Sequence, residues 1–264
     1  SSTRFNRVFF ALVSMGSTIG RTAGPESCVM TRTRTVQRLL VLAPAPGEAA
    51  AIRRRRRAPS PGAGRGWAVE DGGRGVGLVE TGVGKAHAGG AAGWAFRGQR
   101  WVVNLGVAGA LPGSSLATGD VVLATRSVFA DEGMETPGGF VAIEEMGFSS
   151  GGGAAPGPEL AGLLRPLADA AGVIATVSTC SASDARAERV RERTGAIGEA
   201  MEGAAIGAAL SRVPGFALGS FAELRVVSNT TGDRDRQSWD LAGALARLEA
   251  LAWDVAGVLG APAG

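Results

Sequence analysis

Asn229 ends an apolar segment that begins at Glu223, and the acidic residues Asp233 and Asp235 follow it closely. Ligands of an open α/β sheet bind at the carboxyl ends of its strands. A side-chain amide at that place presents one donor and one acceptor in a fixed plane, which matches the edge of a purine base. Asparagine is also common in turns, because it tolerates their backbone geometry. A base-binding role therefore depends on the residues that precede Asn229.

An acidic residue upstream could bind the sugar of the same ligand. Glu202 follows Met201 about one strand–helix unit before Asn229. A carboxylate can accept hydrogen bonds from two vicinal ribose hydroxyls, and it places negative charge beside a developing cation. The alternative is structural, because the helix dipole favours an acidic residue at the start of a helix. Glu199, slightly earlier in the chain, is the weaker candidate for the sugar-binding role.

The composition excludes several classes of function. His87 is the only histidine, so a site built on several histidines is impossible, and no Gly-x-Ser-x-Gly elbow accompanies it. Cys28 and Cys180 lie far apart, and we expect free thiols in a cytoplasmic protein without a metal or a cofactor. A net charge of +3 is too small to indicate nucleic acid. No apolar run approaches the ~18 residues that span a bilayer, so we expect no membrane partner.

Strand-like and helix-like segments alternate from Val36 to the end of the chain. This alternation predicts an α/β fold, with a single three-layer αβα domain at residues 36–260 around a central mixed, largely parallel sheet. Residues 1–35 do not share the pattern, and we expect them to form a poorly ordered N-terminal extension. Within the domain, residues 158–171 are predicted to form a helix, and the Gly-rich residues 130–157 a long loop.

The order of these segments resembles the nucleoside phosphorylase/hydrolase superfamily, on its hydrolytic side, over roughly residues 36–258. The resemblance is carried by residues 82–88, 103–109, 199–206 and 223–235. Within the superfamily the chain is most similar to the futalosine hydrolases, nucleosidases of menaquinone biosynthesis, through residues 228–235, residues 131–135 and Phe140. The resemblance implies a nucleoside phosphorylase-like fold and hydrolysis of futalosine to dehypoxanthine futalosine and hypoxanthine. It also implies a homodimer or a higher homo-oligomer and no cofactor.

The resemblance assigns roles to the residues that match the family's motifs. Glu48 stands where the related hydrolases hold the carboxylate that positions and deprotonates water, although capping of a helix would also explain it. Met201 and Glu202 match the pair that binds ribose. The remaining residues expected to bind substrate are Ala108, Gly109, Phe140 and Ser228.

The base that is removed is predicted from Asn229. Related adenine nucleosidases carry aspartate at this place, whereas an amide can donate to the 6-oxo group of hypoxanthine and accept from a protonated ring nitrogen. Asn229 therefore favours a 6-oxopurine. Loss of the aspartate also removes the obvious acid for the leaving base. Asp233 or Asp235 could replace it, and both could equally be turn residues.

Water is the predicted nucleophile. Related phosphorylases hold phosphate with an arginine at the position of Asn104, and without that cation a bidentate phosphate contact is lost. The turn before Lys85 lacks the spacing of a phosphate-binding loop.

Three alternatives remain open: a methylthioadenosine/adenosylhomocysteine-type nucleosidase, a purine nucleoside phosphorylase-like enzyme, and a nucleoside-binding protein without turnover. Asn229 counts against the first, as does the lack of an aromatic residue around residues 179–184, where the adenine enzymes stack their base. The presence of both Glu48 and Glu202 counts against the last.

Overall fold

The computed structural model describes residues 37–54, 66–149 and 153–260. The predicted extension at residues 1–35 and the predicted free thiol of Cys28 lie outside these ranges. The strands are β1 (Leu39–Ala43), β2 (Glu70–Asp71), β3 (Val76–Glu80), β4 (Trp101–Ala110), β5 (Val121–Phe129), β6 (Gly133–Thr136), β7 (Gly139–Ala142), β8 (Ala170–Thr176), β9 (Gly198–Ala200) and β10 (Phe221–Thr230). The α-helices are α2 (Pro46–Arg54), α3 (Lys85–Ala95), α4 (Pro158–Leu164), α5 (Asp184–Thr194), α6 (Gly203–Leu210) and α7 (Leu241–Leu259), and two short 3-10 turns are η2 (Arg165–Leu167) and η3 (Arg234–Arg236).

The main sheet is mixed, in the order β10-β5-β8-β9-β4-β1-β3-β2, and β10 pairs with β4 as well. Most neighbouring strands run parallel, whereas β5 and β10, β4 and β9, and β2 and β3 run antiparallel. Because of the extra pairing, β4, β10, β5, β8 and β9 close into a ring, and the remaining strands continue the sheet from β4. The predicted mixed, largely parallel sheet is confirmed.

Helices cover both faces of this sheet. On one face α2, α4 and α7 pack against Leu39 and Val41 of β1 and their neighbours. On the other face α3 and α6 pack against Leu40 and Leu42. Successive side chains of a strand point to opposite faces, so a strand covered on both sides is apolar throughout. The three-layer αβα architecture predicted from the alternation is confirmed.

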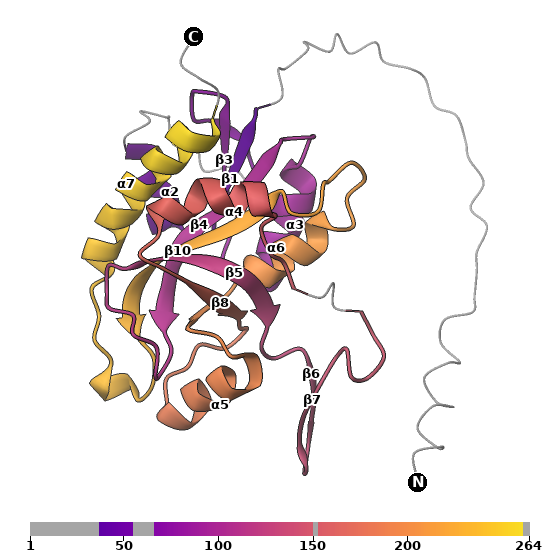
Figure 1. The fold of residues 1–264 in the computed structure, drawn as a ribbon, viewed down its shortest axis with the longest axis vertical. Coiled ribbons are helices and arrows are strands. Elements are labelled where there is room, and N and C mark those ends of the chain that lie inside the picture. The colour runs from indigo at the N-terminus through magenta and orange to yellow at the C-terminus, as the bar shows by residue number, and fades with distance from the viewer. Residues whose placement is uncertain (1–36, 55–65, 150–152, 261–264) are drawn as a thin grey trace, which may run out of the picture. The chain divides into compact units, whose positions relative to one another are not determined.

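The structure differs from the sequence prediction in two segments. The helix predicted at residues 158–171 ends at Leu164, because Pro166 has no backbone N–H and the chain tightens into η2 before β8 begins at Ala170. The loop predicted at residues 130–157 contains the β6–β7 hairpin, which extends away from the main sheet (Figure 1). Within the described ranges, no helix is both long and apolar enough to cross a membrane.

Candidate active site

A cavity of about 280 Å³ opens where the parallel strands β1, β4, β8 and β10 end, beside β9. This is the edge at which open α/β sheets bind ligands. Most of the residues predicted to bind substrate or act in catalysis line it: Glu48, Ala108, Gly109, Met201, Glu202, Ser228 and Asn229. Tertiary structure thus brings together residues from four separate parts of the sequence.

A buried charge cluster forms one end of the cavity. Arg225 is 1% exposed, and its Nε donates to Glu223 Oε1 at 2.7 Å while its Nη2 donates to Glu202 Oε2 at 2.9 Å. Its Nη1 donates to the carbonyl of Val107 at 3.3 Å, so each nitrogen of the guanidinium already has an acceptor. Burial alone would lower the pKa of Arg225. The negative charges of Glu223, Glu202 and Glu48 raise it by more than burial lowers it, so the pKa is raised overall and the side chain stays charged.

Glu48 is held on the wall of the cavity by two backbone donors. Its Oε1 accepts from Val107 N–H at 2.7 Å and its Oε2 accepts from Ala45 N–H at 2.7 Å. Burial raises the pKa of this carboxyl, and Glu202 adds to the rise, while Arg225 and the two backbone donors oppose it. A carboxylate with a raised pKa takes a proton from water more readily than an exposed one.

Glu202 directly precedes α6 and lines the same cavity. Its Oε1 accepts from Gly84 N–H at 3.0 Å, and its Oε2 accepts from Arg225 and, at 3.2 Å, from Met201 N–H. Only 3% of the residue is exposed. Its carboxylate is therefore fixed in place before any ligand arrives.

Gly106 in β4 makes room for this cluster. A Cβ at this position would lie 2.5 Å from Arg225 Nη1 and 2.6 Å from Glu48 Oε1. Any side chain would push these groups apart. The glycine in the middle of β4 is therefore required by the close approach of two charged side chains.

Asn229 and Ser228 line the cavity near the end of β10. The Ser228 hydroxyl donates to Asn229 Oδ1 at 2.9 Å, and Asn229 Nδ2 donates to the carbonyl of Thr230 at 2.9 Å. These contacts orient the amide and leave it one further hydrogen and one further lone pair. The amide can therefore both donate to and accept from a ligand.

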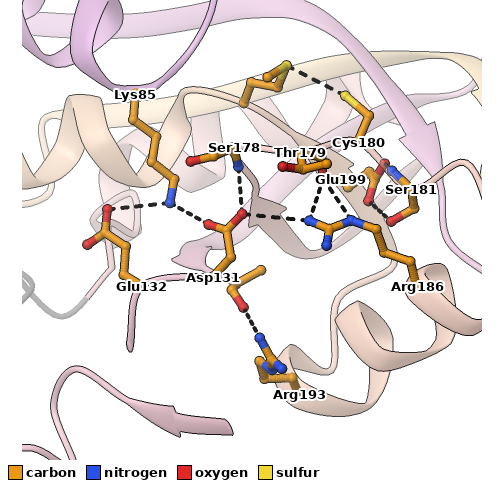
Figure 2. A network of polar contacts seen from close by, with 12 residues as sticks. Lys85, Asp131, Glu132, Ser178, Thr179, Cys180, Ser181, Arg186, Arg193 and Glu199 are labelled. Carbon is orange, nitrogen blue, oxygen red and sulfur yellow. Dashed lines mark hydrogen bonds and ion pairs between the residues drawn. The ribbon is translucent and has the colours of Figure 1, made fainter. Parts of the chain in front are cut away.

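The loop at residues 178–181 forms another wall, and β9 supports it. Glu199 Oε1 accepts from Ser181 N–H and Glu199 Oε2 accepts from the Ser181 hydroxyl, both at 2.7 Å (Figure 2). Burial raises the pKa of Glu199, although the two Ser181 donors oppose the shift. Gln237 Nε2 donates to the Ser181 carbonyl at 3.1 Å, which ties this loop to the segment after β10. The predicted weaker candidate for sugar binding, Glu199, thus has structural partners already.

Asp233 and Phe140 do not line the cavity. Asp233 Oδ1 accepts from Asp184 N–H at 2.9 Å, at the start of α5, and the other oxygen accepts from Arg236. These donors lower the pKa of Asp233, so the carboxyl group holds a proton less readily. A general acid must hold a proton before it can give it to the leaving base. Phe140 lies in β7, where the guanidinium of Arg193 stacks 3.5 Å from the centre of its ring.

The sequence interpretation missed Arg225, although a signal was present. Glu223 and Arg225 alternate with Leu224 and Val226, so both charges point to the same face of β10. The position of Asn104 carries no arginine, as the sequence shows, but Arg225 of β10 brings a cation to this end of the cavity. With its amide oxygen facing Arg225, Asn104 accepts from Nη2 at 2.6 Å.

In the described part of the chain, no three histidine, cysteine, aspartate or glutamate side chains are grouped so as to hold a metal ion.

Comparisons with known proteins agree with this geometry. The model of the phosphorylase superfamily matches residues 38–259. The chain belongs to the phosphorylase superfamily. The match to this superfamily covers the described sheet and every residue that lines the cavity. The resemblance predicted from the sequence is confirmed.

Among members of the superfamily, a futalosine hydrolase from Acidothermus cellulolyticus is 42% identical to this chain over 154 residues. That match covers 56% of this chain and 61% of the relative, so the chain spans about three fifths of the relative's length.

Solved structures share the fold. A futalosine hydrolase mutant from Helicobacter pylori is 18% identical, with a TM-score of 0.66 over 84% of this chain and 99% of that one. A methylthioadenosine/adenosylhomocysteine nucleosidase from Colwellia psychrerythraea, solved with adenine, is 21% identical, with a TM-score of 0.68 over 87% and 98%. At these identities the likeness shows a common fold and nothing more.

Proposed function

We propose that this protein is a purine nucleosidase that hydrolyses futalosine to dehypoxanthine futalosine and hypoxanthine, a step of menaquinone biosynthesis. The observation that carries the proposal is the charge cluster. In it Arg225 donates hydrogen bonds to Glu223 and Glu202, and it also interacts with the charge of Glu48. The name of the 42% identical relative supports futalosine as the substrate.

The charge cluster favours hydrolysis over phosphorolysis. Phosphate recognition in proteins relies on an arginine fork that is free to make two parallel hydrogen bonds. The nitrogens of Arg225 instead donate to protein acceptors, and three carboxylates surround the place where a phosphate dianion would bind. The same negative charge stabilises the oxocarbenium-like cation that forms as the base leaves. This observation counts against the purine nucleoside phosphorylase alternative.

The two carboxylates at the sugar end have different roles in the proposal. Glu48 accepts a proton from the attacking water, because its raised pKa suits a general base. Glu202, held rigidly by Gly84 and Arg225, accepts hydrogen bonds from the ribose hydroxyls. Met201, Ala108 and Gly109 form the surface around the sugar.

In this proposal Asn229 recognises the base through hydrogen bonds. When the bond between sugar and base breaks, its electron pair stays on the base, which takes up a proton from solvent. The second hydrogen of the Asn229 amide donates to the 6-oxo group, and its oxygen accepts from the resulting ring N–H. Ser228 maintains this orientation because its hydroxyl donates to the amide oxygen. A methylthioadenosine-type enzyme needs an acceptor for the 6-amino group instead, so Asn229 favours the 6-oxopurine.

The test is to incubate the purified protein with futalosine, inosine and methylthioadenosine, each with and without phosphate, and to detect the released base. We expect hypoxanthine from futalosine at the same rate in both buffers, and a sugar product without phosphate. A ribose 1-phosphate product would contradict hydrolysis, and preferential release of adenine would support the methylthioadenosine alternative.

We further propose that the enzyme acts in the cytoplasm without a cofactor, as a homodimer or higher homo-oligomer. In this proposal the enzyme binds the nucleoside substrate and binds neither nucleic acid nor a membrane.

A further inference from the structure

Asp131 is a partly buried link between two segments that contribute to the cavity. Its Oδ1 accepts from Lys85 Nζ at 2.5 Å, and its Oδ2 accepts from Ser178 N–H at 2.7 Å. Arg186 Nη2 lies 3.8 Å from the same Oδ2. Figure 2 shows the carboxylate between Lys85 on one side and Arg186 of α5 on the other.

The Lys85 side of this link leads to Glu202. Lys85 is the first residue of α3, and the residue before it, Gly84, donates its N–H to Glu202 Oε1 at 3.0 Å. The ammonium also lies 3.4 Å from Glu132 Oε1 and 5.0 Å from the ring centre of Phe129. Fixing Lys85 therefore fixes the turn whose backbone holds Glu202.

The Ser178 side leads to the cavity wall at residues 178–181. Arg186 donates to the carbonyl of Thr179 at 3.1 Å from Nε and 2.7 Å from Nη2, beside Asp131. Cys180 lines the cavity, and its Sγ lies 3.6 Å from Met201 Sδ. The Asp131 carboxylate thus holds the beginning of a loop whose next residues form part of the binding surface.

We propose that Asp131 is a positioning residue of the nucleosidase site. Through Lys85 it holds the turn that carries Gly84 and Glu202, and through Ser178 it holds the wall that carries Cys180. The inference rests on the proposed function for its kinetic consequence. It gives a role to Lys85 and Asp131, neither of which lines the cavity.

The exposure of the pair separates this role from that of an ordinary surface ion pair. Exposed pairs contribute little, because solvent screens them. The side chains of Lys85 and Asp131 are only 14% and 22% exposed, and Asp131 also satisfies a backbone donor. Reactive groups that move by about 1 Å can lose about 100-fold in rate. A small shift of this link therefore has a large effect on the site.

The first experiment measures kcat and KM for futalosine in Asp131→Ala and Lys85→Met. We expect kcat/KM to fall by about 10- to 100-fold, with a rise in KM, because the ribose-binding carboxylate and the cavity wall both move. Asp131→Asn keeps an acceptor for Ser178 N–H but loses the charge, and we expect an intermediate loss. A purely structural defect would leave fewer active molecules, which lowers apparent kcat at unchanged KM.

The matched control is Glu135→Gln. Glu135 lies in β6, four residues after Asp131, and also pairs with an arginine, Arg193. Its side chain is 76% exposed, and it does not line the cavity. We expect its kinetics to stay within about twofold of wild type, as is usual for an exposed pair. The double variant Asp131→Ala/Lys85→Met should be no worse than the more damaging single variant, because both break one link.

A second experiment does not depend on enzyme activity. Alkylation of Cys180 by iodoacetamide is followed at one pH by peptide mass spectrometry, which distinguishes it from Cys28. We expect the Cys180 rate to change at least severalfold in Asp131→Ala and Lys85→Met and to be unaltered in Glu135→Gln. If wild type fails to cleave futalosine while this pattern holds, the proposed function is wrong and the positioning role stands. Wild-type KM together with a wild-type alkylation rate in both variants would overturn the proposal.

Discussion

At the scale of single residues, burial decides the protonation behaviour of Glu48. Its raised pKa means that the carboxylate, the form that can accept a proton from water, is lost at a higher pH than for an exposed glutamate. We therefore expect kcat/KM to fall as pH decreases through that raised pKa. Glu48→Gln should lower kcat by about 10²–10⁴-fold with little change in KM, and should lack this acidic limb. A pH–rate profile checks both, and an unchanged limb in the variant would exclude Glu48 as the base.

Arg225 is the residue whose loss should cost most in stability. Removing one partner from a buried ion pair typically costs about 3–5 kcal/mol, because the remaining charge is left without compensation. Arg225→Met would leave Glu223 and Glu202 in that state, so we expect a loss in this range in urea unfolding. Adding Glu223→Gln to Arg225→Met should restore part of the stability. Unfolding free energies within about 1 kcal/mol of wild type for Arg225→Met would contradict this account.

Asn229 should set the choice between purines. Asn229→Asp replaces the donor to a 6-oxo group with a repelling acceptor, while a 6-amino group gains a partner. A mismatched buried hydrogen bond costs about 1–3 kcal/mol, or roughly ten- to a hundredfold in rate. The measurement is the ratio of kcat/KM for futalosine over its 6-amino analogue, which we expect to fall by that factor. An equal ratio in wild type and variant would mean that Asn229 does not face the base.

At the scale of elements, β4 contributes a glycine that no other residue type could replace. In Gly106→Ala the new Cβ would lie within 2.6 Å of both Arg225 and Glu48, which other contacts hold in place. We expect a loss of both activity and thermal stability. Gly162→Ala in α4 is the control, because nothing lies within 4 Å of its Cβ.

For this control we expect unchanged kinetics and stability that is equal or higher, by up to about 1 kcal/mol, because alanine favours helix. Thermal unfolding and kcat/KM measured side by side distinguish the two variants. A Gly106→Ala enzyme with wild-type turnover would show that the cluster adapts more easily than its contacts imply.

At the scale of the whole molecule, the rim of the cavity exposes large apolar side chains. Val83 is 47% exposed, Trp239 50% and Leu241 47%, and all three line the cavity. A symmetric neighbour that covered this rim would bury apolar surface and complete the cavity. We expect light scattering to give a homodimer or a larger closed assembly. A monomer at micromolar concentration would contradict this prediction.

Local periodicity in the sequence was sufficient to predict the architecture. The apolar run of β1 and the alternation of strands and helices reflect which faces are buried, and that depends mainly on neighbouring residues. Motif positions likewise located Glu48, Glu202 and Asn229 in the cavity. These inferences succeeded because the carboxyl ends of parallel strands necessarily meet at one edge of a sheet.

Only the tertiary structure decided which charges meet. The register of β10 on β4 places Glu223 opposite Asn104, and this puts Arg225 between carboxylates that come from α2, β10 and the start of α6. In the same way, Asp131 contacts Lys85 and Ser178 across long stretches of sequence. The sequence by itself determined the fold and the places of Glu48, Glu202 and Asn229, because these follow from local pattern. Strand register and burial decided their partners and protonation, because these depend on contacts between segments that are distant in the chain.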